Sequence, residues 1–163
     1  MSIDMNDRAA VEHKLWDDIE RHQTGMLGLA EEPTLQPMTA FVERGGERLW
    51  FFSRTDSELA RRIGQGREGM FVFQQRDLQA TITGHMSVQH DAARIDKDWN
   101  AVVAAWHPQG KSDPRLTLIC LDARDAEVWC SQAGPVTFAW EIAVANARKH
   151  EPHLGGRTNL HFH

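Results

Sequence analysis

Residues 36–63 constrain the fold most strongly, because they form an unbroken pattern of strand, glycine turn, strand and helix. The stretch Gln36–Val42 is β-prone, Gly45-Gly46 can supply the positive φ values of a tight hairpin, and Leu49–Ser53 is the returning strand. Thr55-Asp56-Ser57-Glu58 then predicts a capping box that opens a short helix. A strand that leads into a helix N-terminus collects free backbone N–H groups, which predicts a site for an anion such as a phosphate.

The rest of the chain adds strands joined mostly by short turns, with helices at both ends and between them. We expect further helices over 8–22, 92–106 and 136–149, and further strands over 24–30, 70–73, 79–89, 116–121 and 126–130. This order predicts an α+β fold with a six- to seven-stranded, mostly antiparallel sheet. A closed or partly closed barrel would hide the strand edges. We expect a single domain over 1–150 and a mobile C-terminal tail over 151–163.

Composition excludes several classes of protein. The net charge of −5 gives no overall attraction to nucleic acid or acidic lipid. The first seven residues contain no basic segment and no apolar segment, so we expect no signal peptide, and no apolar run approaches the roughly 20 residues of a membrane helix. The two cysteines lie within expected strands, which favours a reducing cytoplasm over a disulfide framework.

Four landmarks between Val11 and Ser131 carry a family resemblance. They are Gln36-Pro37-Met38, the aromatic strand Trp50–Ser53 followed by Asp56-Ser57, the strand Gln79–Gly84, and the loop Trp106–Pro114 together with Glu127-Val128-Trp129. In this order and spacing they resemble the FMN-binding split barrels of the pyridoxamine 5'-phosphate oxidase-like family, and more closely its general stress protein subfamily.

The resemblance implies a homodimer with one FMN in each of two clefts at the dimer interface. It implies that Gln79 offers its amide to the isoalloxazine ring, that Ser57 contacts the phosphate and that Trp106 covers a face of the ring. The full set of expected flavin contacts is Gln36, Pro37, Met38, Thr39, Phe52, Ser53, Ser57, Arg61, Gln79, Trp106 and Lys111.

The basic residues that grip the phosphate in this family are replaced here. The corresponding positions hold Gln36, Glu58 and Leu59. Charge-assisted hydrogen bonds are about twice as strong as neutral ones, so these replacements predict weak flavin binding or its loss. A capping box would turn Glu58 away from the ligand. Substitute cations lie nearby in the sequence at Arg54, Arg61 and Arg62.

The sequence names no catalytic residue. There is no Tyr, no Ser-His-Asp arrangement and no phosphate-binding glycine loop, and Cys120 and Cys130 are too far apart for a CxxC pair. The chain also lacks the C-terminal Arg-x-His-Asp-Arg element of pyridoxamine phosphate oxidases, so that reaction is excluded. The late histidines His150, His153, His161 and His163 lack the spacing of a tetrahedral zinc set, and we expect no metal site.

Three functions stay open at this point. The chain is a flavin carrier, a flavin-dependent oxidoreductase supplied by a nicotinamide or another electron donor, or a split-barrel binding module that has lost the flavin. The residues that face the phosphate and the access above the ring distinguish these functions.

Overall fold

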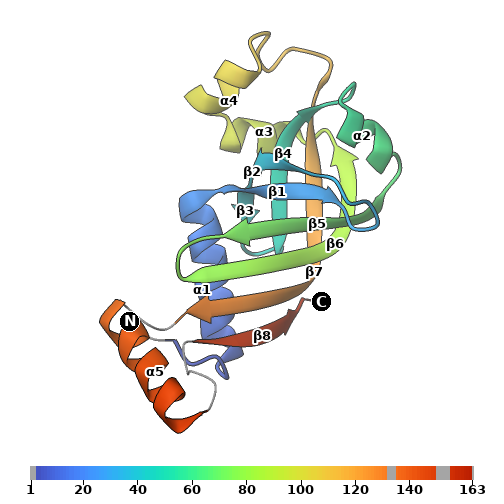
Figure 1. Ribbon diagram of the computed structural model, residues 1–163. Coiled ribbons are helices and arrows are strands. Elements are labelled where there is room, and N and C mark those ends of the chain that lie inside the picture. Colours follow the sequence, from blue (N-terminus) through green and yellow to red (C-terminus); the bar gives the residue numbers. More distant parts are fainter. Residues whose placement is uncertain (1–2, 132–134, 150–154, 163) are drawn as a thin grey trace.

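The structure is a computed structural model that describes residues 3–131, 135–149 and 155–162 (Figure 1). The elements follow in the order α1 (Arg8–His22), β1 (Thr24–Leu29), β2 (Leu35–Thr39), β3 (Phe41–Glu43), β4 (Arg48–Arg54), α2 (Glu58–Ile63), β5 (Arg67–Gln74), β6 (Leu78–Gln89), α3 (Ala92–Asp98), α4 (Ala101–Trp106), β7 (Leu116–Ser131), α5 (Pro135–Arg148) and β8 (Gly155–His161). No helix in the described ranges is both long and apolar enough to cross a membrane.

One curled sheet organises the molecule. Its strands follow the order β2-β1-β5-β6-β7-β4-β3, β8 also pairs with β7, and these described strands pair in antiparallel fashion. The expected α+β class and antiparallel sheet are confirmed. The described residues form eight strands, one more than the upper end of the expected number.

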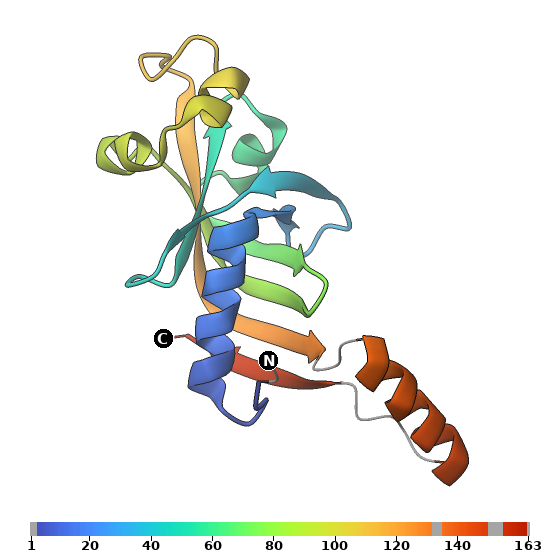
Figure 2. The same cartoon turned by 90° about the vertical axis from the view of Figure 1, so that its left-hand side faces the viewer.

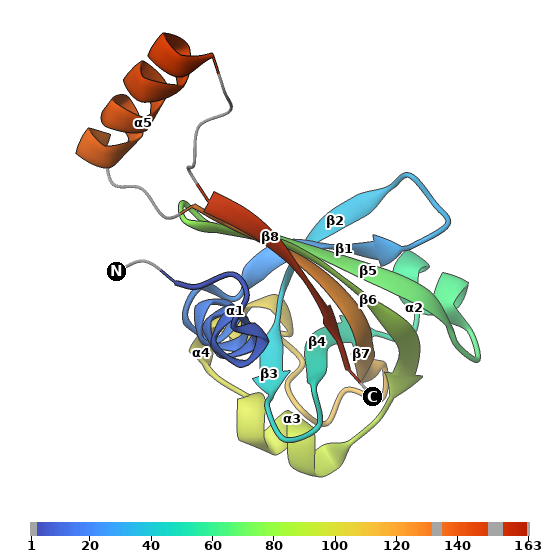
Figure 3. The ribbon, with the colours of Figure 1, turned by 90° about the horizontal axis from the view of Figure 1, so that it is seen from below.

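The two edges of the sheet meet at Ala40. The expected single strand 36–42 is divided here, because β2 pairs with β1 whereas β3 pairs with β4 at the opposite edge. Ala40 is fully buried, and its N–H donates to the Gln23 carbonyl at 2.8 Å. A chain that changes edges within one residue requires the edges to be adjacent, so the sheet curls toward a barrel, as the view from below shows (Figure 3).

Strand β7 runs through the region where two separate strands were expected. It pairs with β4 through Asp122 and with β8 from Asp125, so the two halves of β7 have different neighbours. A bulge lies between these halves: Gly84 is opposite Ala123, but Thr83 is opposite Asp125. The extra residue bends the strand and lets it continue without a turn.

The N-terminal helix α1 covers one side of the curled sheet (Figure 2). The Asp7 side chain caps it by accepting from the Ala10 N–H at 3.1 Å. Its apolar residues Val11, Leu15 and Ile19 are fully buried in the main core, which confirms the spacing expected for an amphipathic helix. The helix thereby supplies core contacts that the sheet alone would lack.

Two local expectations are wrong. The helix expected over 92–106 ends at Asp98, because Trp99 is extended and Asn100 caps a new helix by accepting from the Val103 N–H at 2.9 Å. In the turn between β3 and β4, the positive φ of 54° belongs to Glu47 and not to Gly45-Gly46. Asn100 thus begins a helix where the pattern predicts that one continues, and Glu47 takes the positive φ that the pattern predicts for a glycine.

The expectation of a mobile C-terminal tail is wrong for residues 155–162, whereas 151–154 and His163 lie outside the described residues. Strand β8 pairs with β7 from Ser131 to Asp125, and Phe162 lies in the core with its ring centroid 5.4 Å from that of Trp16. Helix α5, which precedes β8, extends away from the sheet (Figure 2). The chain end is therefore part of the fold and closes the core beneath α1.

We predict that Phe162→Ala lowers the free energy of unfolding by about 3 kcal/mol, because it removes a large side chain that is only 5% exposed. Urea denaturation checks this value. Asn159→Ala, at an exposed position on β8, is the control and should change the free energy by less than about 0.5 kcal/mol. Equal effects of the two substitutions would contradict the packing of the chain end into the core.

Candidate functional site

A cavity of about 780 Å³ opens between β2 and β4 and is covered by α4. Strand β3 pairs with β4 only from Arg48 to Trp50, so the later part of β4 has no strand beside it on that edge within the described chain. The cavity occupies this split, and its volume lies within the range of small-molecule sites, roughly 300–1,000 Å³. Its lining residues are His22, Gln23, Thr24, Gln36, Pro37, Met38, Thr39, Phe41, Phe52, Ser53, Arg54, Ser57, Asn100, Val102, Val103, Trp106 and His107.

Aromatic contacts hold one wall of the cavity. Phe52 makes an edge contact with Phe41 at 5.5 Å between ring centroids, and it lies 6.2 Å from the ring of His107. Trp99 packs against both Phe52 and His107, which anchors the junction of α3 and α4 to the sheet. On the outer side, Trp106 is 79% exposed, so its ring is free to cover a planar ligand.

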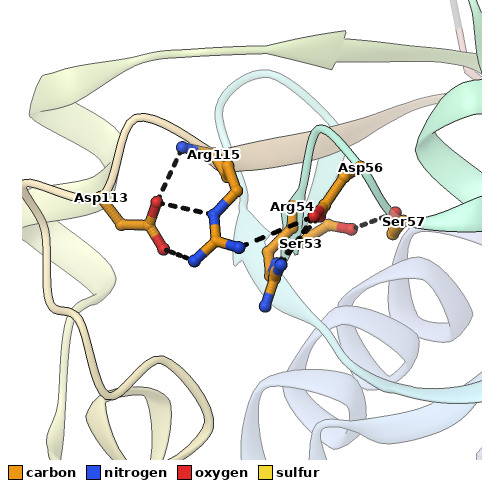
Figure 4. Close-up of polar contacts among 6 residues, drawn as sticks. All are labelled: Ser53, Arg54, Asp56, Ser57, Asp113 and Arg115. Carbon is orange, nitrogen blue, oxygen red and sulfur yellow. Dashed lines mark hydrogen bonds and ion pairs between the residues drawn. The ribbon is translucent and has the colours of Figure 1, made fainter.

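Two serines form the polar end of the cavity. The hydroxyls of Ser53 and Ser57 are 3.0 Å apart, and Ser57 Oγ accepts from the Ala60 N–H at 3.1 Å (Figure 4). One hydroxyl proton is used between the serines, which leaves one O–H to donate to a ligand. Ser57 is therefore the N-cap of α2. The prediction of a capping box that starts at Thr55 is wrong, because the helix begins two residues later.

Two of the positions expected to face a phosphate do not line the cavity. The Glu58 carboxylate forms an ion pair with Arg62 at 2.9 Å, four residues along α2, instead of turning back to the Thr55 backbone. Leu59 is 8% exposed and belongs to the main core. Of the three positions at which relatives carry a cation, only the one held here by Gln36 lines the cavity.

Paired charges surround the serines (Figure 4). The Arg54 guanidinium donates to both carboxylate oxygens of Asp56, at 2.9 and 2.6 Å. Arg115 likewise donates to both oxygens of Asp113, each at 3.1 Å, and lies 3.8 Å from Asp56. These hydrogen bonds lower the pKa of Asp56 and of Asp113, so both carboxylates are ionised at neutral pH and the four charges sum to zero.

Eight of the eleven expected flavin contacts line this cavity, namely Gln36, Pro37, Met38, Thr39, Phe52, Ser53, Ser57 and Trp106. The other three do not line it. Gln79 lies on β6 and donates to the Gln75 carbonyl at 2.6 Å, and Lys111 forms an ion pair with Asp96 at 2.9 Å. Arg61 lies in the last turn of α2. The roles expected for these eleven residues toward a flavin remain predictions.

The cavity also contains residues absent from the expected set. Arg54 directly follows Ser53 on β4, so its place next to the serines could have been derived from the strand itself. His107 ends α4 and turns toward Phe52. The segment 22–24 reaches the cavity because Gln23 bonds to Ala40, and no local sequence pattern signals that long-range contact.

Burial sets the protonation of two groups that could react. It lowers the pKa of His107, with the positive charge of Arg54 acting in the same direction and Asp113 opposing it. The imidazole is therefore neutral at pH 7 and offers one N–H donor and one acceptor. Burial also raises the pKa of Cys120 to about 12, so this thiol is protonated and unreactive.

Comparison with known proteins identifies the class of this α+β barrel and its edge cavity. The sequence pattern of the family described as pyridoxamine 5'-phosphate oxidase like matches residues 10–153. The chain belongs to this family. Comparison with curated proteins found no match.

Solved structures show the same fold. A protein assigned as general stress protein 26 from Jannaschia sp. CCS1 is 27% identical with a TM-score of 0.80, over 94% of this chain and 99% of the other. The general stress FMN/FAD binding protein of Xanthomonas citri is 38% identical with a TM-score of 0.70, over 76% of this chain and 91% of the other. The expected split barrel and its general stress protein relatives are confirmed.

We predict that His107 titrates below the ordinary histidine pKa of about 6.5, because burial disfavours its charged form. Since the folded-state pKa is depressed, the neutral imidazole contributes stability above pH 6.5, and that contribution is lost as the pH falls through the folded-state pKa. NMR titration of the ring protons checks this. Arg54→Gln should raise the pKa of His107, and an unchanged pKa would show that the Arg54 charge does not reach the ring.

Proposed function

We propose that the chain binds a flavin, FMN in particular, in the cavity between β2 and β4. The observation that carries this proposal is that two segments far apart in the sequence, 36–57 and the helix α4 with its flanking residues, converge on one cavity of about 780 Å³ with an aromatic wall and a hydroxyl end. The Xanthomonas citri relative, described as an FMN/FAD binding protein, supports the same ligand class.

The residues fit the ring of a flavin better than its phosphate. Phe52 and Trp106 offer apolar surface to an isoalloxazine, and the backbone of β2 offers hydrogen-bonding groups along its edge. At the other end, one serine O–H and Arg54 would hold the phosphate. Arg54 is the one Lys or Arg among the lining residues in the described chain, and it is already bonded to Asp56. We therefore expect ring contacts to contribute most of the affinity.

A carrier is the function that this site supports best. A bound flavin supplies electron or hydride transfer, while the protein supplies binding, orientation and exclusion of water. Within the described residues, His107 is the one imidazole lining the cavity for which a pKa shift is resolved, and burial moves that pKa downward, away from neutral pH; the ring packs against Phe52 and Trp99. The chain thus holds a ring without presenting a set of proton-transfer groups to a substrate.

A flavin-dependent oxidoreductase is the second candidate function. The exposure of Val102 at 63% and Trp106 at 79% favours it, because a bound ring would be accessible from that side to a nicotinamide or another electron donor. The donor would transfer electrons to the ring directly. Reduction of the bound flavin by NADH or NADPH faster than that of free FMN would establish this function.

We predict that FMN added to the purified protein gives a shifted flavin absorbance spectrum and quenched fluorescence. Trp106→Ala should weaken FMN binding by about 3- to 10-fold, the value of one lost aromatic contact. Trp140→Ala, which removes a 68% exposed indole on α5, is the matched control and should leave the affinity unchanged. Absence of any spectral change would favour a binding module that has lost the flavin.

We also propose that the chain forms a homodimer through the outer face of the sheet. Met26 pairs in register with Val72, and Val72 pairs with Thr81, so these outward side chains form a row across β1, β5 and β6. Trp129 extends the same face on β7 and is 48% exposed. The row is bordered on β7 by Glu127, which is opposite Thr81 and paired with Arg157 at 3.2 Å. A sheet face with apolar and small polar groups at its centre and a charged pair at its border is suited to a self-complementary interface.

We predict that the wild-type chain sediments at twice its mass of 18.5 kDa and that Val72→Glu shifts it to the monomer, because the substitution buries a charge in the interface. Val72→Thr, which keeps the shape of the side chain, should remain dimeric. Analytical ultracentrifugation at micromolar concentration distinguishes these outcomes. A wild-type monomer would overturn the proposed dimer.

A further inference from the structure

The cation that faces the hydroxyl end of the cavity already has an anionic partner. Arg54 lines the cavity, and Asp56 accepts two hydrogen bonds from its guanidinium, at 2.9 and 2.6 Å (Figure 4). Asp56 itself does not line the cavity. The pair occupies the Nε and Nη2 donors of the guanidinium, so a bidentate phosphate contact through that edge requires Asp56 to be displaced.

Two neighbouring arginines are also paired within the chain. Arg115 is held by Asp113 through two side-chain hydrogen bonds, and its remaining contact, at 3.8 Å, is with Asp56. On α2, Arg62 lies between Glu58 and Glu32, at 2.9 and 2.7 Å. Arg61, the remaining arginine of α2, lies in the last turn of the helix and does not line the cavity, so Arg54 is the one arginine of the described chain that does.

We propose that Asp56 is an internal competitor for the phosphate of the ligand, and that Arg54 binds a phosphate monoester only by leaving Asp56. The inference rests on the proposed flavin function for its ligand. As it stands, the site gains little from a phosphate, so FMN binds only slightly more tightly than unphosphorylated riboflavin. The pair is about half exposed, so its exchange requires no opening of the core.

The test is the substitution Asp56→Asn, which removes the competing charge and keeps the side-chain shape. It should strengthen FMN binding by about tenfold, the effect of one charge-assisted hydrogen bond gained, and leave riboflavin binding unchanged. Asp96→Asn is the matched control, because it changes the net charge equally and frees Lys111 outside the cavity. It should change neither affinity. Equal changes for FMN and riboflavin in Asp56→Asn would overturn the proposal.

A second variant separates competition from simple repulsion. If Asp56 acts through Arg54, the double variant Arg54→Gln/Asp56→Asn loses most of the gain in FMN affinity. If the gain persists without Arg54, Asp56 acts only by repelling the phosphate through space, and the proposal is wrong.

A measurement without flavin tests the competition between Asp56 and phosphate independently of the proposed flavin binding. In titrations with inorganic phosphate, the Arg54 Nε–H resonance, assigned by its loss in Arg54→Gln, should shift at about tenfold lower phosphate concentration in Asp56→Asn than in the wild type. Equal concentrations would overturn the competition. If neither flavin binds to the wild type or to Asp56→Asn, the proposed function fails, and the phosphate titration still decides the role of Asp56.

Discussion

The backbone hydrogen bond from Ala40 to the Gln23 carbonyl is the contact on which the geometry of the sheet depends. Neighbouring strands lie about 4.8 Å apart, so a chain that leaves β2 and enters β3 within one residue must bring both edges of the sheet together. The fully buried methyl group of Ala40 permits this approach, whereas a larger side chain would overpack it. Beyond the junction β2 and β4 diverge, and the cavity is the space that this divergence leaves.

The charges near the cavity show why counting basic residues in an aligned position is a poor guide to an anion site. Glu58 and Leu59 suggest a phosphate site that has lost its cations, yet one is bonded to Arg62 and the other is in the core. The one Lys or Arg that lines the cavity in the described chain is Arg54, which the sequence marks only as a nearby cation. Its availability depends on Asp56, two residues away, and that local pairing has no relation to the overall net charge of −5.

Local patterns predicted the parts of the fold that depend on neighbours in sequence. The spacing in α1 and the hairpin that leads to α2 are of this kind, and eight expected site residues line one cavity because seven of them come from residues 36–57. The errors have long-range causes. The change of edge at Ala40 depends on Gln23, and the strand β8 depends on a partner in β7 and on Trp16. A short polar C-terminal stretch carries no periodic signal that reveals those partners.

The position of Gln79 connects the site to the proposed dimer. Its neighbours Leu78 and Ala80 are buried, so Gln79 belongs to the outward face of β6, where it is opposite Trp129 of β7. That face is the one on which the dimer is proposed, and it does not line the cavity of the same chain. A glutamine so placed can contact a flavin only if the flavin is held by a second copy. The expected role of Gln79 therefore requires the dimer, whereas Phe52, Ser57 and Trp106 line a cavity within one chain.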